Sequence, residues 1–455
     1  MPVAHIDPNS LLSGSQPLNS ADRLMLIAHR AMRGVGHGGF QCQSHVWLSG
    51  RIDAERLGEA IGRLATAYPV ITGRLEEGSN NGVPRWRFDP QRVPPLHRAE
   101  LPTDDPADAR AYGEKLFVTP MDLDRDAPIS FHLLHQPGGR DVFILHFSHV
   151  LMDGKAPEFV LRELSRCHDE VGSEGAGPAE SIDACPKDEI SEHLLRYPRK
   201  KRIKAALSVI RQNIRLPGKP IIMTPPDQMA WGCEPYGIEV LALSADQSRQ
   251  VERRAKAICG FVNLTPLILA SAFRVVARLS RQPQKPGSIF RTDVPLNLRA
   301  PGRSEPIFRN FMSFIQLEIR RQALEDRDRA SKLLHDSMRD QIRRSIELGN
   351  LQMMSWLAPR ERLLERFIRD QSEKQPATFG FGFLGPVIAD LETFCGQPTS
   401  LVYTLNSALS PPGVTLQVNQ YRGCLHLMAT YIVGPVSRAG AGEFLIAIAE
   451  DLCGE

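Results

Sequence analysis

Apolar residues recur along the first half of the chain with two different periods, which predicts alternating helices and strands. Residues 54–68 have apolar positions at helical spacing, namely Leu57, Ala60, Ile61, Leu64 and Ala65. Residues 129–135 and 141–147 are β-type runs separated by Gln-Pro-Gly-Gly-Arg, which predicts a hairpin. The second run leads into His149 and then into a predicted helix over residues 157–170. The sequence therefore places His149 at a strand-to-helix junction, where α/β folds often carry their chemistry.

The second half of the chain repeats this alternation. It predicts a strand at 237–243, helices at 245–259 and 265–278, strands at 287–294 and 310–319, a long charged helix at 327–348, and a closing β hairpin at 404–420 and 424–432. Between the halves, residues 172–184 have the Gly-, Ala- and Ser-rich composition of a linker. We therefore expect a mixed α/β (α+β) protein with an N-terminal lobe over 1–183, a linker with a basic helix over 184–235, and a C-terminal lobe over 236–455.

Length, charge and cysteine content narrow the class of protein. A chain of 455 residues suits two domains, and its 42% hydrophobic and 24% charged residues are those of a folded soluble protein. No secretory signal and no membrane-spanning run is visible, so we expect a cytoplasmic protein. A net charge of +3 gives no reason to expect nucleic acid. The eight cysteines form no CxxC pair, so we expect scattered reduced thiols and no metal site.

The segment His149-Val-Leu-Met-Asp153-Gly154 holds the strongest candidate chemistry. Histidine titrates near neutral pH, so it can accept a proton and return it. Asp-Gly permits a tight turn, and Gly154 removes a Cβ where a long substrate arm can pass. The alternative is a hydrogen-bonded core histidine beside a turn. His146, three residues earlier, suggests a metal pair only weakly, and a packed strand residue is the simpler interpretation.

This segment resembles the HxxxDG signature of the CoA-dependent acyltransferase superfamily, which includes chloramphenicol acetyltransferase, plant acyltransferases, wax ester synthases, polyketide-associated acyltransferases and the condensation domains of peptide synthetases. Other segments are similar to family elements in the same order over residues 50–440. They are 57–75 with Tyr-Pro-Val-Ile-Thr-Gly-Arg-Leu, 261–279, 293–299 with Asp-Val-Pro-Leu-Asn-Leu-Arg, 310–314 with Asn-Phe-Met-Ser-Phe, and 379–386 with Phe-Gly-Phe-Gly-Phe-Leu-Gly-Pro. Two departures stand out: Ser148 replaces the first of two histidines, and Gly-Phe-Leu-Gly replaces the late Asn-x-Gly.

The resemblance implies two chloramphenicol-acetyltransferase-like lobes with an active-site channel between them. It implies that His149 is a general base and that no covalent acyl-enzyme forms. Ser313 aligns with a position that supplies an oxyanion donor in some members; a buried hydroxyl bonded to the backbone is the alternative. Asp153 would be structural and would pair with an arginine, with Arg299 the first choice and Arg74 the second.

The resemblance also implies the reaction class. The main expectation is transfer of an acyl group from acyl-CoA, or from a phosphopantetheinyl acyl carrier, to a hydroxyl of a lipid-like or secondary-metabolite acceptor, with no resident cofactor. The first alternative is a stand-alone condensation enzyme that forms an amide from carrier-bound partners, although Ser148 argues against it. The second is a homologue that binds thioesters or lipids without turnover.

A basic run over residues 196–215 offers a second candidate surface. Apolar residues recur in it at helical spacing, so it can be a solvated helix face, a peripheral membrane contact, or a docking face for an acidic acyl carrier protein or for CoA phosphates. The expected partners are thus a thioester donor and an acceptor, with the protein itself a monomer.

Overall fold

The structure is a computed structural model. It describes residues 14–78, 82–89, 91–172, 189–215, 218–223, 235–261, 263–280, 282–300, 307–374, 377–388 and 391–454. The linker composition noted at 172–184 falls almost wholly outside these residues.

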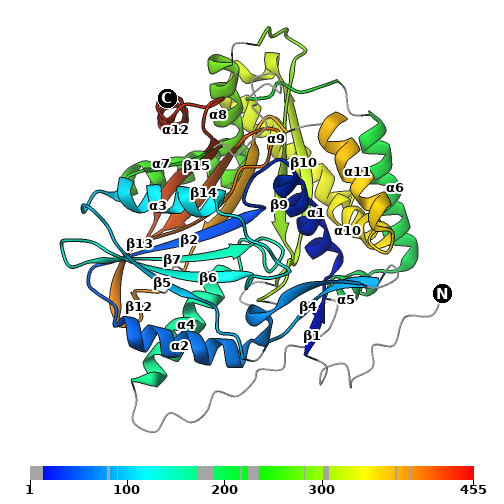
Figure 1. Cartoon of the computed structure of the whole chain (residues 1–455). Helices are drawn as coiled ribbons and strands as arrows, with labels where there is room; N and C mark the ends of the chain where they lie inside the picture. Colours follow the sequence, from blue (N-terminus) through cyan, green and yellow to red (C-terminus); the bar gives the residue numbers. More distant parts are fainter. Residues whose placement is uncertain are drawn as a thin grey trace.

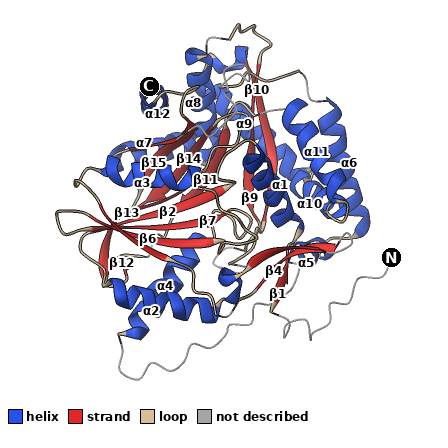
Figure 2. Cartoon of the chain, in the orientation of Figure 1, coloured by secondary structure: helices blue, strands red, loops and turns tan. Residues whose placement is uncertain are grey.

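A six-stranded mixed sheet forms the centre of the first lobe (Figures 1 and 2). Its order is β12-β13-β2-β7-β6-β5, with bounds Thr393–Phe394, Gln397–Asn406, Gln41–Leu48, Asp141–Ser148, Ile129–His135 and Leu96–Glu100. Helices α2 (Ala54–Ala67) and α4 (Pro157–Val171) pack together and share a hydrophobic core with the sheet. Helix α3 (Pro106–Val118) lies on β2 and β7. The predicted hairpin is confirmed as β6 and β7, which pair antiparallel.

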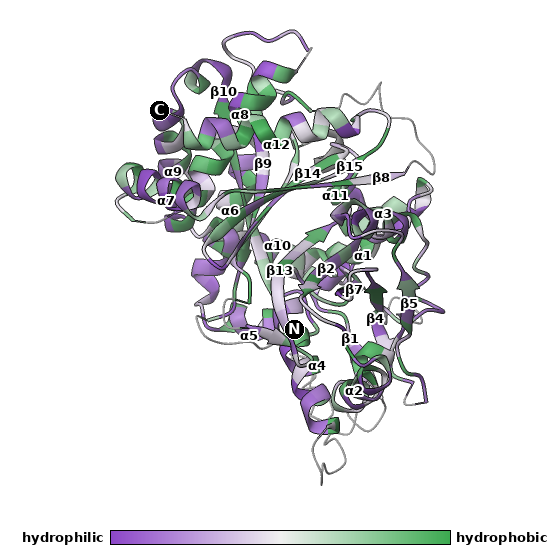
Figure 3. Cartoon of the chain, turned by 90° about the vertical axis from the view of Figure 1, so that its left-hand side faces the viewer, coloured by the Kyte–Doolittle hydropathy of each residue, from purple (hydrophilic) through white to green (hydrophobic). Residues whose placement is uncertain are grey.

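The second lobe is built around a four-stranded sheet of order β11-β14-β15-β8. These strands span Gly380–Pro386, Val414–Tyr421, Cys424–Ile432 and Tyr236–Ala242. Its core is shared with helices α7 (Ala245–Cys259), α8 (Leu264–Leu279), α9 (Arg327–Arg343) and α12 (Arg438–Cys453). Helices α7 and α9 both contact α8. Figure 3 shows that α8 is largely hydrophobic and that α7 and α9 are largely hydrophilic.

Strands β12 and β13 correct the predicted lobe boundary at 236–455. They belong to the second half of the sequence but lie in the sheet of the first lobe, where β13 pairs antiparallel with β2. Val402 and Phe394 join the first-lobe core, and both are fully buried. Strand β2 is buried along nearly all of its length, so the backbone groups on both of its sides need hydrogen-bond partners; β7 supplies them on one side and β13 on the other. The closing hairpin predicted at 404–420 and 424–432 is confirmed as β14 and β15, which pair antiparallel, but its first strand begins at Val414, because residues up to Asn406 belong to β13 in the other sheet.

The long charged helix predicted over 327–348 is two helices. Helix α9 ends at Arg343, and α10 (Ile346–Leu357) begins after Ser345, whose φ of 57° lies in the left-handed region. A continuous helix cannot contain that backbone conformation. Helix α10 then turns to contact β10 (Met312–Arg320), which pairs with β9 (Ile289–Asn297) in a two-stranded sheet.

The described part of the predicted linker, 184–235, contains ordered helices. Helix α5 (Glu189–Leu195) and helix α6 (Arg199–Arg215) both contact α10. Helix α6 buries Ala205, Ala206 and Val209 and leaves its basic residues mostly exposed. The predicted basic helix over 196–215 therefore exists as α6 from Arg199 onward, docked on the second lobe.

The remaining elements complete the rim of the molecule. They are α1 (Ser20–Gly34), α11 (Glu361–Lys374), and a three-stranded sheet of β1 (Ser15–Pro17), β4 (Gly82–Arg87) and β3 (Arg74–Gly78). Among the described residues, no individual helix has the length and apolar content to cross a bilayer; α7 and α8 meet that criterion only jointly, at a bend of 103°.

Candidate functional site

His149 lies immediately after β7, on the loop that connects this strand with α4. Its backbone N–H donates to the carbonyl of Phe40 at 3.0 Å, and its ring stacks on the Phe40 ring at 4.7 Å between centroids. The residue as a whole is half-buried. Nδ1 is buried without a hydrogen-bond partner among the described residues. The imidazole is therefore held by stacking and by its backbone, and no carboxylate of the described residues is bonded to it.

Burial lowers the pKa of the His149 imidazole from its ordinary value of 6.5. Neighbouring groups raise this pKa and partly offset the effect of burial. In decreasing order of effect, the first three are the backbone of His149 itself, the Asp153 carboxylate and the Asn310 side chain. A lowered pKa keeps the ring neutral at neutral pH, which is the form that a general base requires.

Asp153 is bound in a buried ion pair. Its Oδ2 accepts from Arg299 Nη1 at 2.7 Å and from the Phe311 backbone N–H at 2.9 Å, while Oδ1 accepts from the Lys155 N–H at 3.1 Å. The expected partner Arg299 is thus in place. Arg74, the second candidate, instead lies 3.6 Å from Asp89 at the surface. Because Arg299 follows β9, this pair ties the HxxxDG loop of one lobe to a strand of the other.

Gly154 lies against strand β11. A Cβ at Gly154 would come within 3.2 Å of Leu384 Cδ2, so the position accepts a side chain only if Leu384 moves. Next to it, Lys155 Nζ donates to the carbonyls of Leu384 at 3.2 Å and Pro386 at 2.9 Å. The HxxxDG loop therefore contacts the element that departs from the family's Asn-x-Gly.

Ser313 is fully buried on β10, and its hydroxyl donates to the carbonyl of Glu347 at 2.7 Å. Its single proton is used in that bond. A role as oxyanion donor requires the hydroxyl to rotate away from Glu347, so this role stays a proposal.

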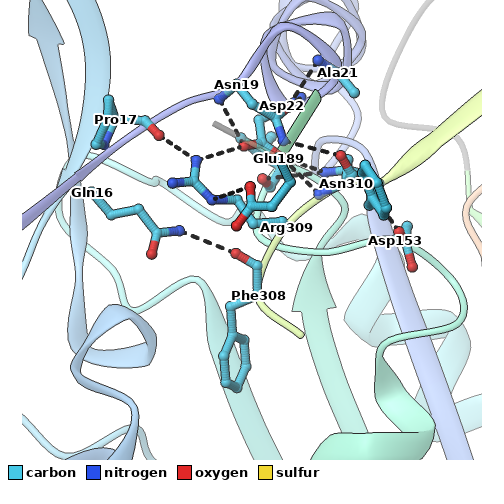
Figure 4. A network of polar contacts seen from close by, with 12 residues as sticks. Gln16, Pro17, Asn19, Ala21, Asp22, Asp153, Glu189, Phe308, Arg309 and Asn310 are labelled. Atoms are coloured by element: carbon cyan, nitrogen blue, oxygen red, sulfur yellow. Dashed lines mark hydrogen bonds and ion pairs between the residues drawn. The ribbon is translucent and has the colours of Figure 1, made fainter. Parts of the chain in front are cut away.

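The roles of Asp22 and Asn310 were not found from the sequence; Asn310 contacts the His149 loop directly, and Asp22 contacts it only through Asn310 (Figure 4). Asn310, which precedes β10, donates through Nδ2 to the His149 carbonyl at 2.8 Å and to Asp22 Oδ1 at 3.0 Å. Asp22 lies in the first turn of α1, where it forms a capping box with Asn19. The Asn-x-x-Asp pattern before a helix was visible in the sequence, but it predicts a cap and not a partner about 290 residues away.

His146 packs within the sheet of the first lobe. Its Nε2 lies 2.9 Å from Gln41 Oε1, and its ring centroid lies 6.0 Å from that of His132, which in turn stacks on His97 at 4.7 Å. Burial lowers the pKa of His146 to about 3 and that of His132 to about 2. Within the described ranges, no group of three or more His, Cys, Asp or Glu residues has metal-binding geometry.

Two surface cavities lie away from the HxxxDG loop. One, of about 580 Å³, is lined by charged residues of the second lobe, including Arg254, Arg274 and Asp451; the other, of about 570 Å³, lies between α4 and β12. Neither is lined by His149, and the channel between the lobes stays a prediction.

Comparison with known proteins gives a result at the level of three-dimensional structure. No protein-family model and no curated protein matches the chain in sequence. Among solved structures, it is similar to the first condensation domain of the CDA synthetase, with a TM-score of 0.70 and 15% identity over 96% of both chains.

This chain has the condensation-domain fold. The epimerization domain from the third module of tyrocidine synthetase B has the same fold, with a TM-score of 0.65 and 12% identity over 97% of this chain and 96% of that one. So does the X-domain from teicoplanin biosynthesis, solved in complex with OxyB, with a TM-score of 0.67 and 13% identity over 99% and 95%. The expected two-lobed mixed α/β architecture is confirmed. Because this fold occurs in domains named for condensation and for epimerization, the chemistry must be argued from the site.

Proposed function

We propose that the protein is a stand-alone condensation-type acyltransferase, in which a phosphopantetheinyl thioester donates its acyl group to a nucleophile activated by His149. One observation carries this proposal: the half-buried residue His149, whose imidazole pKa is lowered by burial, follows Ser148 on a loop that the Asp153–Arg299 ion pair ties to the other lobe. The condensation-domain fold supports the donor class, because condensation domains are transferases that use carrier-bound thioesters.

The proposed reaction needs one proton acceptor and no covalent enzyme intermediate. Neutral His149 takes a proton from the acceptor as the acceptor attacks the thioester carbonyl. The tetrahedral intermediate then collapses, the carbon–sulfur bond breaks, and the imidazolium returns the proton to the departing thiolate. General acid–base catalysis of this kind contributes about 10²- to 10⁴-fold in rate.

Helix α6 supplies the surface that we propose for the carrier protein. Residues 196–211 include seven Lys and Arg residues and no Asp or Glu. Exposed Ile203, Leu207 and Ile210 lie among them, with 36%, 47% and 39% of their surface exposed. An acidic helix with a small apolar face complements this pattern.

Ester formation from acyl-CoA is the second candidate, and Ser148 favours it. Ser148 stands where many members of the resembled family carry a first histidine, and within the described part of the chain its buried hydroxyl accepts a local bond from the Val150 N–H at 3.2 Å. A lipid-like or secondary-metabolite alcohol remains the acceptor in this case.

A thiol-release assay tests these proposals. Acyl-CoAs and acyl-carrier thioesters are each presented with pools of amines, alcohols and carrier-bound aminoacyl groups, and free thiol is measured with and without acceptor. We expect acceptor-dependent release that is largest with the carrier donor and lost in His149→Ala. Release with acyl-CoA and an alcohol establishes the second candidate instead.

The third reading, a thioester- or lipid-binding homologue without turnover, has its own outcome. If carrier or acyl thioester binds the protein but no pool yields acceptor-dependent thiol, the catalytic proposal is wrong. Full turnover by a folded His149→Ala variant refutes it as well.

A further inference from the structure

Phe40 contacts His149 through both its backbone and its side chain. Strands β2 and β7 pair antiparallel with Gln41 opposite Ser148, so Phe40 and His149 lie opposite each other one residue further along. The carbonyl of Phe40 accepts from the His149 N–H at 3.0 Å, which extends the ladder by that pair. Opposite residues of an antiparallel pair place their side chains on the same face, and here the two rings stack with 4.7 Å between their centroids and 27° between their planes. The register of the two strands therefore sets one ring on the other.

The backbone that leads into Phe40 is closely packed, which fixes the position of its ring. A Cβ at Gly38 would lie 2.4 Å from the Phe117 carbonyl oxygen, at the end of α3. A Cβ at Gly39 would lie 2.3 Å from the ring of His29 on α1, and the φ of Gly39 is 110°, a conformation that other residues rarely adopt. Phe40 itself is only 5% exposed. The segment is thus held between two helices and leaves the aromatic ring little freedom to move.

A stacked neighbour orients an imidazole without using its nitrogens. The lone pair of the basic nitrogen lies in the plane of the ring, whereas the Phe40 ring covers one of its faces. The edge of the His149 ring, which carries the proton-accepting atom, is therefore not occupied by the stack.

The same stack distinguishes the two protonation states of His149. The face of a phenyl ring attracts a cation that lies within about 6 Å of its centroid. In the proposed reaction the imidazole becomes a cation when it takes the proton, in a position where burial disfavours the charged form. The Phe40 ring therefore stabilises His149 more after it has accepted the proton than before.

We infer that Phe40 is a positioning residue for His149: its carbonyl fixes the main chain, its ring orients the imidazole, and the face of that ring stabilises the imidazolium formed during acyl transfer. This inference rests on the proposed function, because it states how the base of that reaction is aimed and how its charged form is supported.

Two replacements at Phe40 separate orientation from charge. Phe40→Leu removes the ring but keeps an apolar side chain and the carbonyl. Pentafluorophenylalanine at position 40, introduced by stop-codon suppression, keeps nearly the same ring shape but reverses its quadrupole, so its face repels a cation. The matched control makes the same two replacements at Phe143, which is fully buried in the same core and packs on Phe394 at 4.8 Å between centroids.

The first readout is the pKa of the His149 imidazole in the free protein, followed by NMR titration and assigned by the signal missing in His149→Gln. We expect the fluorinated ring at position 40 to lower this pKa, because the imidazolium loses an attraction and gains a repulsion. The Asp153 carboxylate and the Asn310 side chain, which also act on this pKa, are the same in every variant. Both replacements at Phe143 should leave the pKa of His149 at its wild-type value.

The second readout is kinetic. Misplacing a catalytic group by about 1 Å can cost about 10²-fold, so kcat of Phe40→Leu should fall by about that factor while KM changes less than about threefold. In the fluorinated variant, the acid limb of kcat/KM should move to lower pH by about half a pH unit or more, because a base of lower pKa loses its proton at lower pH. The Phe143 variants should keep the wild-type acid limb even if they are equally destabilised.

Each outcome decides the inference. A folded Phe40→Leu with the wild-type kcat overturns the orienting role, and Phe40→Met takes its place if the leucine variant does not fold. An unchanged pKa of His149 with the fluorinated ring, or an equal change from the same ring at position 143, overturns the stabilisation of the imidazolium. If the wild type shows no turnover, the proposed function fails, while the titration still decides how the Phe40 ring acts on His149.

Discussion

A buried ion pair such as Asp153–Arg299 costs desolvation energy before it contributes attraction, because both groups leave water. Here the side chains are only 5% and 1% exposed. The Phe311 and Lys155 N–H groups satisfy further lone pairs of Asp153, which is what makes such a pair tolerable. If one partner is removed, the other remains as a buried charge without compensation, and its full desolvation cost lowers the free energy of unfolding.

Asp153→Ala should lower the free energy of unfolding by about 3–5 kcal/mol, because it leaves Arg299 charged and buried. Urea unfolding followed by intrinsic fluorescence measures this. The matched control is Asp89→Ala, which breaks the exposed pair with Arg74 and should cost less than about 1 kcal/mol. Equal effects of the two changes would contradict the buried-pair argument.

The histidines of the first-lobe sheet predict the pH dependence of stability. Burial lowers the pKa of His45, His132 and His146 to about 3, 2 and 3. Below pH 6.5 the unfolded chain binds protons that the folded chain does not, so stability is complete above about 6.5 and declines as the pH falls toward 3. His132→Gln should make the slope of unfolding free energy against pH shallower over this window.

Tyr112→Phe is the control for that slope. It removes the contact of 3.1 Å between Tyr112 Oη and His132 Nδ1 but leaves the titrating group in place. Stability should drop while the slope stays that of the wild type. A His132→Gln slope identical to the wild-type slope would refute the assignment of the depressed pKa.

At the scale of single residues, the sequence predicted the main residues of the site but not the long-range contacts between them. His149, Asp153 and Arg299 stand out because a local motif and a family pattern mark each of them. Asn310 was noted only as part of a strand, and Asp22 was not singled out, because the contact between them spans 288 residues. Local patterns carry no information on such pairs without an alignment of homologues.

Helices show a similar division between local and tertiary determinants. The bounds of α2 and α7 agree with their apolar spacing, since each has a capping residue and one buried face. The break between α9 and α10 was not predicted, because Arg-Ser at positions 344–345 is not a helix-breaking pair by propensity. It is the packing of α10 on α6 and β10 that turns the chain there.

Gly349→Ala tests the packing of α10 on α6. A Cβ at Gly349 would lie 2.5 Å from the Ala205 carbonyl oxygen and 2.7 Å from Val209 Cγ2, so backbone must move. We expect a loss of about 1–3 kcal/mol from overpacking. Gly58→Ala, inside α2 with nothing within 4 Å of the new Cβ, should gain about 0.5–1 kcal/mol from helix propensity. Thermal unfolding of both variants separates the two effects, and a stabilised Gly349→Ala would show that the helices are not in contact.

The exposed face of α6 predicts an electrostatic dependence of the carrier reaction. Replacing Arg199, Lys200 and Lys204 by Glu should lower kcat/KM for a carrier-bound donor by at least about tenfold, with a weaker salt dependence, because steering by the basic face is lost. The same variant should keep the wild-type kcat/KM for a free pantetheine thioester.

The control replaces Arg249, Arg253 and Lys256 on α7 by Glu and should leave kcat/KM unchanged for both donors. Equal loss in the two variants would remove α6 as the docking face, and binding of the wild type to anionic vesicles without any carrier dependence would assign α6 to a membrane surface.

The molecule has two lobes, but each half of the sequence does not form one lobe by itself. Strands β12 and β13 of the second half complete the first-lobe sheet, and segment 308–311 of the second half holds the His149 loop. The sequence predicted two lobes correctly in number, and it could not predict this exchange, because strand periodicity says which face of a strand is buried and not which sheet receives it. The catalytic geometry proposed for His149 therefore depends on both halves.

Cutting the chain between residues 235 and 236, at the boundary predicted from the sequence, tests this interdependence. Fragment 1–235 should not fold by itself, because β2 becomes an edge strand whose neighbour supplied Val402 and Leu405, both fully buried in the intact protein. An exposed apolar edge of this kind promotes aggregation. Co-expression of 1–235 with 236–455 should restore a soluble complex with the wild-type far- and near-ultraviolet circular dichroism, since the exchanged strands pair without covalent continuity at that point. A monomeric 1–235 fragment with a cooperative thermal transition would show instead that the first lobe is autonomous, and Asn310 and Phe311 would then contact a preformed His149 loop.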